Sequence, residues 1–515
     1  MMKRLLALLA LVSSLVLAVA APRSEAGQPM AGGTLRYGMV TEVSSLDPHV
    51  YVGSSWKVLN AAFYDTLLAF TQDARLVPAL AESWDTSDAK TYVLRLRKGV
   101  RFHGGEPFTA QDVKYSLERA MDPKTGATLR ENLLGTKVTV VDDFTVRLER
   151  PTPDATLLNV LAMPEVAILS SEWMKSNPNV KVKANGTGPF ILKEYEPGVR
   201  AVAEKNPNYF RKGQPLLDRV EFRMIKNDDA RVNALRTAAV DMIEFVPWKD
   251  IDTLKRQSGI KVEASGGAFM NLWINTKKKP LDDPRVRRAL AFAVDREAIS
   301  KAAFFGHGSP LYGPPTSPDS PYFNKDLASA FSHDPQKAKA LLKEAGVPEG
   351  QELELLVFQG LGIYTSTAQI VQANLKQVGI NARIKLVEWA NVVESKNKGA
   401  YDFMVYGVNV KLPDPDVYAY YFGADSSYWA SPIGFRDETI ETLVKKGRAL
   451  TDTDARKKVY AELERRVIEV SPWVFINWRD QAQAYRDSVQ GYKQLGGALS
   501  ESGPGIALPV MWIKR

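Results

Sequence analysis

Two short motifs in this chain of 515 residues carry residue types that can activate a nucleophilic serine. Ser54 to Lys57 reads S-x-x-K, and Lys124 to Gly126 reads K-T-G, two of the three elements of penicillin-recognising serine acylases. The third element, a Ser-x-Asn between them, is absent, and K-T-G follows an Asp-Pro pair that predicts a turn instead of a strand. Because the chain also lacks G-x-S-x-G, P-loop and G-x-G-x-x-G motifs, we expect no catalytic residues.

The histidines do not indicate a metal site. His49, His103, His307 and His333 are scattered without the spacing of metal ligands, and the chain has no cysteine. We therefore expect no metal and no other cofactor. His103 stands in a predicted turn, where a structural hydrogen bond is the expected role. Basic residues alternate with acidic ones instead of forming a stripe with aromatic residues, so no nucleic-acid partner is expected.

The strands and helices that would position a site are most clearly indicated by the sequence between residues 75 and 121. Tyr92, Leu94 and Leu96 alternate with residues of a second face, which predicts a strand with one buried side. A short partner strand is predicted at 100–102, followed by a Gly-Gly turn. Thr109 with Asp112 forms a capping pair that predicts a helix up to 121. Asp-Pro pairs at 283–284 and 334–335 predict two further helix starts, and strands alternate with helices along the chain, which indicates a mixed α/β protein.

Composition indicates an exported protein with several lobes. The chain is longer than one hydrophobic core usually serves, and its formal net charge is +8. Basic Lys3 and Arg4, an apolar run over 5–21 and small residues after it predict a cleaved signal peptide at 1–26. No other segment is long enough to span a bilayer. Since no cysteine can carry a lipid anchor, we expect a soluble periplasmic protein with a dispersed basic surface.

Several segments match the sequence motifs of one family and occur in the same order along the chain. The block at 75–121 is the first, and the others are NGTGPF at 185–190, NPNYF at 206–210, DRVEFRMI at 218–225, DDPRVRRALAFAVDREAI at 282–299, DPQKAKALLKEAG at 334–346, YDFMVYG at 401–407 and PDPD at 413–416. Together they resemble extracellular solute-binding protein family 5, the peptide/nickel/opine class of substrate-binding proteins of ABC importers.

The resemblance implies an α/β fold of the periplasmic binding protein type (type II, cluster C), with two hinged lobes and an inserted extra domain. Lobe I would comprise 27–60, 188–270 and 476–515, the inserted domain 61–187, and lobe III 271–475. The solute would lie between lobes I and III, where hinge closure removes it from water. The implied partners are the solute and the permease subunits of the inner membrane, with separate ATPase subunits, and the protein itself would be a monomer.

The resemblance also points to the residues that would bind the solute. They come from the loop after the first strand, from the strand that enters lobe III, and from the strand and loop around YDFMVYG: Tyr51, Phe269, Asn271, Trp273, Trp389, Tyr406, Gly407, Asn409, Lys411 and Asp414. Aromatic walls would supply apolar area and tolerate varied side chains. For each tryptophan, burial in a core is the alternative.

Lys411 departs from the pattern of the peptide-binding members. These commonly place an aspartate before the PD motif, where it pairs with the peptide α-ammonium, whereas this chain has Lys411 there. A desolvated ammonium would repel a bound ammonium, so a free peptide amine is disfavoured. Our hypothesis is that Lys411 meets a carboxylate, phosphate or hydroxyl of the solute. The alternative is that a gap shifts the alignment and Lys411 extends into solvent.

The sequence therefore predicts a periplasmic substrate-binding component that captures a small hydrophilic solute, such as a short peptide, a peptide-like or opine-like compound, or an anionic one. Two alternatives stay open. One is a secreted serine hydrolase that uses Ser54, and the other is a periplasmic chaperone or scaffold without a transport role.

Overall fold

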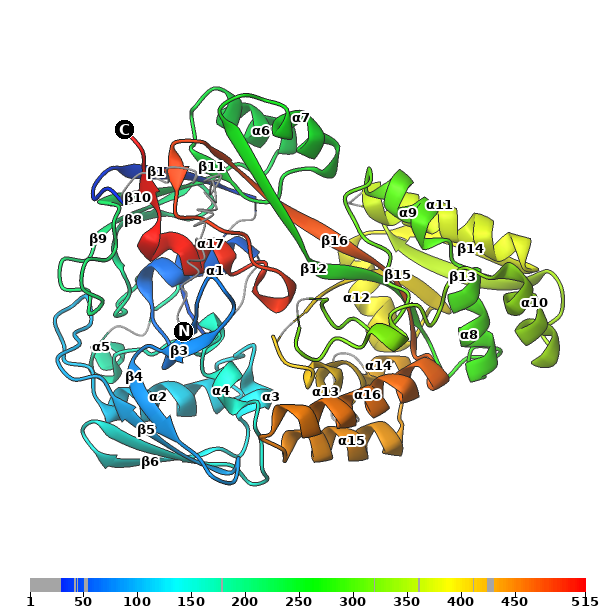
Figure 1. The fold of residues 1–515 in the computed structure, drawn as a ribbon, viewed down its shortest axis with the longest axis horizontal. Coiled ribbons are helices and arrows are strands. Elements are labelled where there is room, and N and C mark those ends of the chain that lie inside the picture. The colour runs from blue at the N-terminus through cyan, green and yellow to red at the C-terminus, as the bar shows by residue number, and fades with distance from the viewer. Residues whose placement is uncertain are drawn as a thin grey trace, which may run out of the picture.

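The structure is a computed structural model. It describes residues 29–40, 43, 45–50, 54–176, 179–318, 320–359, 362–410, 412–423 and 430–515. The predicted signal peptide at 1–26 and the predicted site residues Tyr51 and Lys411 lie outside the described residues. Three groups of elements stand out in Figure 1: the sheet beside the C-terminus at upper left, a smaller sheet below it, and a helix-rich part at right.

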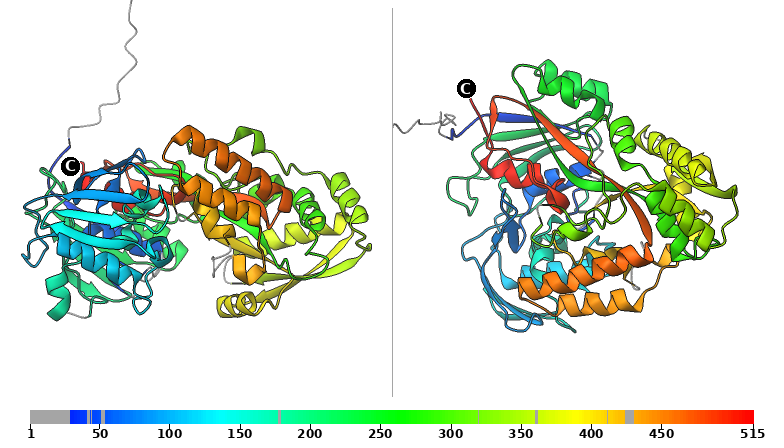
Figure 2. Two further views of the ribbon diagram at one scale, coloured as in Figure 1. Left: turned by 90° about the horizontal axis from the view of Figure 1, so that it is seen from below. Right: turned by 45° about the vertical axis from the view of Figure 1, so that its right-hand side comes forward.

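A ten-stranded mixed sheet runs through two of these groups. Its strand order is β14-β13-β15-β12-β16-β11-β1-β10-β9-β8. The strands span β1 Thr34–Met39, β8 Phe190–Glu196, β9 Arg200–Lys205, β10 Arg219–Met224, β11 Met242–Ile243, β12 Ile260–Ile274, β13 Gln351–Phe358, β14 Ile380–Val387, β15 Phe403–Asn409 and β16 Trp473–Arg486. The two longest, β12 and β16, pair antiparallel and connect the two parts (Figure 2).

The β12–β16 ladder is irregular where it passes between the two parts. Its register shifts between Gly266 and Ala268 and again between Met270 and Asn271. Such shifts bend a strand and weaken its pairing locally. The predicted lobe boundaries at 270/271 and 475/476 fall inside these two strands, and they stay predictions.

We call the part that contains β1 and the C-terminus lobe I, after the prediction, and the predicted bounds of the three parts stay a prediction. Strands β1 and β8–β11 pack against α1 (Ser54–Phe63) and α17 (Gly503–Ala507), around an apolar core that includes Tyr37, Trp56 and Phe222. Helices α6 (Asp228–Arg236) and α7 (Ile251–Lys255) lie at the top in Figure 1. A two-stranded sheet of β17 (Val489–Gln490) and β18 (Trp512–Ile513) lies near the C-terminus.

The inserted domain is built on a four-stranded antiparallel sheet. Its order is β4-β5-β7-β6, with β4 Ala81–Asp85, β5 Thr91–Leu96, β6 Lys137–Asp142 and β7 Thr145–Glu149. The remaining elements are the pair β2 (Leu68–Phe70) and β3 (Leu76–Pro78), and the helices α2 (Ala110–Met121), α3 (Arg130–Leu133), α4 (Leu157–Val160), η1 (Pro164–Val166) and α5 (Ser171–Ser176).

The local predictions for this domain hold with one exception. Tyr92, Leu94 and Leu96 are buried on one face of β5, and the Asp112 carboxylate accepts the Thr109 backbone N–H at 2.8 Å at the start of α2. The predicted strand at 100–102 is wrong. Only an isolated bridge joins Arg101 to the residue at 107, because the turn between them folds the chain back too soon for a ladder.

The helix-rich part corresponds to the predicted lobe III and has three layers. On one side of the sheet lie α8 (Pro284–Ala293), α9 (Arg296–Ala303), α10 (Pro335–Glu344) and α11 (Gly362–Gln377), and on the other α12 (Trp389–Lys398), α13 (Val417–Phe422), α14 (Ala430–Ile433), α15 (Glu438–Arg448) and α16 (Thr453–Val470). As predicted, Asp283 and Asp334 cap α8 and α10. Short 3-10 helices span Trp248–Asp250, Lys325–Leu327, Gly497–Leu499 and Leu508–Val510.

Two histidines join lobe I to the inserted domain as neutral side chains. His49 Nε2 donates to the carbonyl of Ala167 at 3.0 Å, and Arg119 donates to its Nδ1 at 2.9 Å. His103 Nε2 donates to the carbonyl of Gly188 at 3.0 Å, the structural role expected for it. Burial lowers the pKa of both His49 and His103 to about 4.

We expect the contribution of His49 and His103 to the free energy of unfolding to fall as the pH is lowered from about 6.5 to about 4, while buried carboxyls such as Asp416 and Glu464, whose pKa values burial raises to about 6, act in the opposite direction. In this range the unfolded chain binds protons at His49 and His103 that the folded chain does not bind, so the stability present above pH 6.5 is lost. Each histidine contributes on the order of 3 kcal/mol. Urea unfolding at several pH values measures the effect. His103→Gln should reduce the pH dependence, whereas His333→Gln, at a partly exposed ring, should leave it unchanged.

Candidate functional site

A cavity of about 570 Å³ lies where the three parts meet. The inserted domain lines it with 72–74, lobe III with 315–317, 320–321, 410, 412–415 and 417, and the C-terminal part of lobe I with 493–499. Its volume is within the range of cavities that hold a small solute, and junctions between domains are where such sites are common. The Gly/Pro-rich passage around 306–321 contributes to its wall without forming a helix or strand of its own, as its composition predicts.

A cluster of polar side chains from distant segments lies next to two wall segments of this cavity along the chain. Asn409, at the end of β15, precedes Val410 in the cavity wall, and Glu501 follows the 493–499 wall. The Asn409 side-chain N–H donates to Glu501 Oε1 at 2.7 Å, and Arg479 of β16 donates to Asn409 Oδ1 at 3.3 Å. The cluster thus joins the C-terminal segment of lobe I to β15 of lobe III.

Arg479 is the cation of this cluster. It is partly buried, and its Nε is buried without a hydrogen-bond partner. Within the part of the chain that the structure describes, no carboxylate pairs with its guanidinium, whereas Arg448, Arg456 and Arg466 each have one. Arg287 and Arg296 also have no carboxylate partner, but their guanidinium groups donate to several backbone carbonyls. A partly desolvated guanidinium of this kind favours a carboxylate, which it can bind through two parallel hydrogen bonds.

Gly407, a predicted site residue, allows Arg479 and Tyr364 to approach β15 closely. A Cβ at this position would collide with the Tyr364 hydroxyl and lie 3.1 Å from Arg479 Nη1. Tyr364, on α11, is therefore a further member of the cluster. The space beside the Gly407 backbone is filled by these two side chains.

We expect Gly407→Ala to lower solute affinity at least tenfold, because the added methyl group displaces the Tyr364 hydroxyl and the guanidinium of Arg479 by tenths of an ångström or more. Titration calorimetry measures the affinity. Gly362→Ala, at a glycine whose Cβ would meet no atom within 4 Å, serves as the control and should retain binding. Equal affinities of the two variants would contradict a role for this contact.

The predicted aromatic residues form a connected row in lobe III. Trp389 stacks on Tyr406 at 5.7 Å between ring centroids, and Tyr406 contacts Trp273 at 4.6 Å. Trp389 is 40% exposed, whereas Tyr406 and Trp273 are buried. Of the three, Trp389 presents the largest accessible face to a solute.

Two further predicted residues, Phe269 and Asn271, lie inside lobe III. The Phe269 ring is fully buried and contacts Tyr421, Trp473 and Trp478, so the packing argues against a place in a pocket wall. Asn271 is also fully buried, and neither atom of its amide has a hydrogen-bond partner among the described residues. Their contact with a solute stays a prediction.

Asp414 lines the cavity, but its carboxylate already has partners. Its two oxygens accept from Arg456 of α16 at 2.8 and 2.9 Å, and one also accepts from Asn159 of α4 at 3.1 Å. The neighbouring Asp416 pairs in the same way with Arg448 of α15. The PDPD motif therefore fastens lobe III internally and to the inserted domain.

The S-x-x-K motif has a structural explanation. Lys57 of α1 is buried, with its Nζ 3.6 Å from Glu165 and 3.5 Å from Glu501. Burial lowers the pKa of Lys57, but the two carboxylates outweigh this effect and raise it above the ordinary value. A lysine held in its charged form cannot accept a proton from a serine, and K-T-G lies in a turn after α2, as expected.

Sequence reasoning missed Arg479, Glu501 and Tyr364. One signal was available for Arg479, since it directly follows the largely apolar run PWVFINW of β16. Among the described residues, no group of three potential metal ligands occurs, and no helix has both the length and the apolar character needed to cross a bilayer.

Comparison with known proteins agrees with this architecture. The family model of bacterial extracellular solute-binding proteins, family 5, matches residues 75–429. Di/tripeptide-binding protein 2 of Pseudomonas aeruginosa is 30% identical, over 93% of this chain and 96% of its own.

Two solved structures share the fold over almost the whole chain. AgaA of A. tumefaciens R10, in complex with agropinic acid, is 36% identical with a TM-score of 0.84, over 94% of this chain and 99% of its own. DppA of Helicobacter pylori, in complex with the peptide STSA, is 26% identical with a TM-score of 0.81, also over 94% and 99%. The predicted periplasmic-binding-protein fold is thereby confirmed. The chain belongs to the bacterial extracellular solute-binding proteins, family 5.

Proposed function

We propose that this protein captures a small hydrophilic solute that carries a carboxylate, of the opine-like or peptide-like class, and delivers it to the permease of an ABC importer. The single observation that carries the anionic preference is Arg479, a partly buried guanidinium that has no carboxylate partner in the described chain and that donates to Asn409, the residue before Val410 of the cavity wall. The serine-hydrolase alternative loses support because Lys57 is held by two carboxylates.

Closure supplies the affinity in this proposal. Lobes I and III meet through Asn409 and Glu501 at the edge of the cavity, and an enclosed carboxylate would interact with Arg479 at a lower effective dielectric than in water. Binding shifts the equilibrium toward the closed form only by the difference in affinity between the two forms. The permease then recognises the closed form.

The relatives support the choice of solute class. AgaA was solved with agropinic acid, and MoaA of A. tumefaciens R10 with mannopinic acid. The Pectobacterium atrosepticum relative, 27% identical over 87% of this chain, is a glutathione-binding protein. We extend to this chain only the shared chemistry, a compact polar molecule with at least one carboxylate. Lys411, if it faces the cavity, would add a second positive charge.

Several further parts of the proposal rest on the sequence. We propose that residues 1–26 are cleaved on export, that no lipid anchor is attached, and that the mature protein acts as a periplasmic monomer without enzymatic activity. The family consists of substrate-binding proteins that act with ABC permeases. The permease of this system would carry separate ATPase subunits.

Titration calorimetry with agropinic acid, mannopinic acid, glutathione and the dipeptide Met-Leu tests the proposal. We expect saturable binding of at least one of the carboxylate-rich probes, and at least tenfold weaker binding of its carboxamide derivative. Small-angle scattering should show a smaller radius of gyration with the bound probe. Binding of carboxamide and acid with equal affinity would overturn the anionic preference, and no saturable binding or closure would favour the chaperone or scaffold alternative.

A further inference from the structure

We propose that Glu501 and Asn409 are positioning residues, which aim the Arg479 guanidinium at the solute carboxylate when lobe III closes on lobe I. The inference rests on the proposed function, since it assigns a task to residues that need not touch the solute. The proposed arrangement links four side chains that come from different segments of the chain: Lys57, Asn409, Arg479 and Glu501.

The direction of each hydrogen bond in this chain is fixed by chemistry. A guanidinium only donates and an ionised carboxylate only accepts, so the amide between them has one possible orientation. Asn409 must turn its oxygen to Arg479 and its nitrogen to Glu501, as the structure has it. Without the carboxylate at 501, the amide could rotate and present its N–H groups to Arg479, which repels them.

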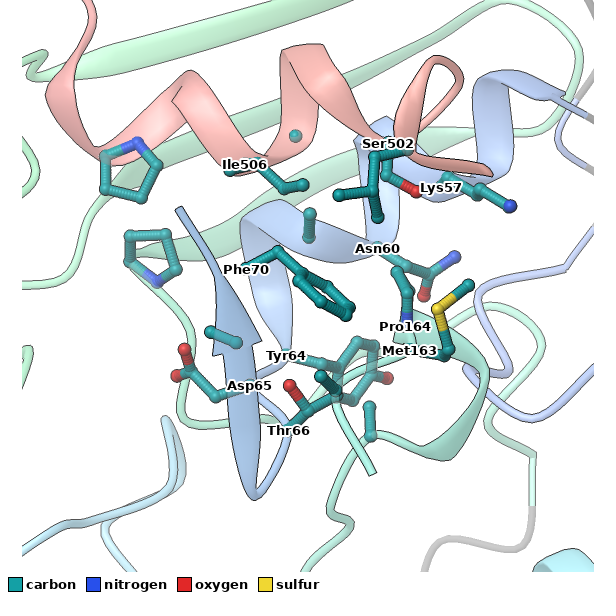
Figure 3. A pocket seen from close by; sticks show the side chains of 18 of the residues that line it. Lys57, Asn60, Tyr64, Asp65, Thr66, Phe70, Met163, Pro164, Ser502 and Ile506 are labelled. Carbon is teal, nitrogen blue, oxygen red and sulfur yellow. The ribbon is translucent and has the colours of Figure 1, made fainter. Parts of the chain in front are cut away.

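Lys57 fixes Glu501 in turn. Glu501 Oε1 accepts from Asn409, while its Oε2 lies 3.5 Å from Lys57 Nζ. The Lys57 and Glu501 side chains are 3% and 7% exposed. Because a buried charge is costly without an opposite charge close by, each of the two stabilises the charged form of the other. Figure 3 shows Lys57 on α1 at the edge of a small pocket, near Asn60 and Ser502.

The second carboxylate that contacts Lys57 provides a comparison within the molecule. Glu165, in η1 of the inserted domain, lies 3.6 Å from Lys57 Nζ and is 3% exposed. It matches Glu501 in charge, burial and partner. None of the described contacts joins it to Asn409, and its Oε2 has no hydrogen-bond partner in the described chain. Glu165 can therefore stabilise Lys57 but cannot orient Asn409.

The chain of contacts crosses between lobes. Lys57 and Glu501 belong to lobe I, whereas Asn409 ends β15 of lobe III and Arg479 lies in β16, which joins the two. Opening of the hinge would separate Asn409 from Glu501. In the open form the guanidinium would lose its orientation, and closure would restore it together with enclosure of the solute. The positioning residues would then make carboxylate recognition a property of the closed form.

The test compares Glu501→Gln with Glu165→Gln, using agropinic acid and its carboxamide as probes. We expect Glu501→Gln to weaken agropinic acid binding about tenfold and to reduce the preference for the acid over the carboxamide by a similar factor. Glu165→Gln should lower the melting temperature by a comparable amount but keep the preference within about twofold of the wild type. The ratio of the two dissociation constants is the deciding quantity, because a general loss of stability does not change it.

The positioning role of Glu501 would be overturned if both variants lost the preference for the acid over the carboxamide to the same extent. It would also be overturned if neither variant lost this preference. If the wild-type protein binds neither agropinic acid nor the other carboxylate probes, the proposed function fails instead. Crystal structures of the two variants then decide the positioning role separately. The Arg479 guanidinium should remain on Asn409 in Glu165→Gln and move away in Glu501→Gln, and an unmoved guanidinium in both would contradict it.

Discussion

Replacing Arg479 with Met should lower the affinity for a carboxylate-bearing solute by about 100-fold, with little change in the affinity for its carboxamide. Truncating one partner of a desolvated, hydrogen-bonded charge pair costs roughly 2–5 kcal/mol, and each 1.4 kcal/mol is a factor of ten. Met preserves most of the length and apolar contact of the arginine stem. Because Arg479 has no carboxylate partner in the described chain, its removal leaves no buried acid unpaired.

Arg486→Met is the matched control for this experiment. Arg486 ends the same strand β16, at the edge that pairs with Ile260, far along the strand from the cavity. The Arg486→Met variant should bind the probe with the same affinity as the wild type. Arg479→Lys should recover only part of the affinity, since an ammonium cannot form the two parallel bonds of a guanidinium. A carboxylate affinity within twofold of wild type in Arg479→Met would remove the central observation behind the proposed function.

Replacing Asp414 with Asn should destabilise the protein by about 3–5 kcal/mol, because it removes one partner of a buried ion pair and leaves the other charge uncompensated. Asp414 and Arg456 side chains are 3% and 6% exposed, and both Asp414 oxygens accept from the guanidinium. Urea unfolding followed by circular dichroism measures the loss. The bond from Asn159 to Asp414 should weaken as well, which loosens the contact between lobe III and the inserted domain.

The same variant decides the role of Asp414. If it is structural, the folded fraction of Asp414→Asn should bind the probe with nearly wild-type affinity at low temperature. Asp454→Asn, at a residue in the first turn of α16 that is 82% exposed and paired with Lys457, is the control and should change stability by less than about 1 kcal/mol. A large loss of affinity without a loss of stability would restore Asp414 to the solute-binding residues.

The local elements could be read from the sequence because their causes are local. The alternation around Tyr92 and the caps at Asp283 and Asp334 depend on residues a few positions apart, and each was found where predicted. The prediction of a strand at 100–102 was wrong, and the cause is again local. A ladder needs room for a second strand, and the turn that follows brings the chain back within a few residues.

The candidate site could be predicted only in part. Gly407 and Asn409 were predicted because they lie in a segment with a recognisable pattern, and Trp389 because it follows a strand, and their contact with a solute stays a prediction. Phe269 shows the limit, since alternation along a strand assigns a residue to a face of the sheet but not to a core or a cavity. Which face is covered depends on helices α12 to α16, whose packing no local pattern specifies.

By itself, the sequence determined the family, the α/β class and the starts of the capped helices, because these depend on short-range patterns and on ordered segments. Only the tertiary structure decided which charged groups meet. Asn409 contacts Arg479 across 70 residues and Glu501 across 92, and Lys57 reaches Glu501 from the opposite end of the chain. Such contacts follow from how β12 and β16 carry the chain between lobes, and burial then makes each charge depend on a partner that sequence spacing does not reveal.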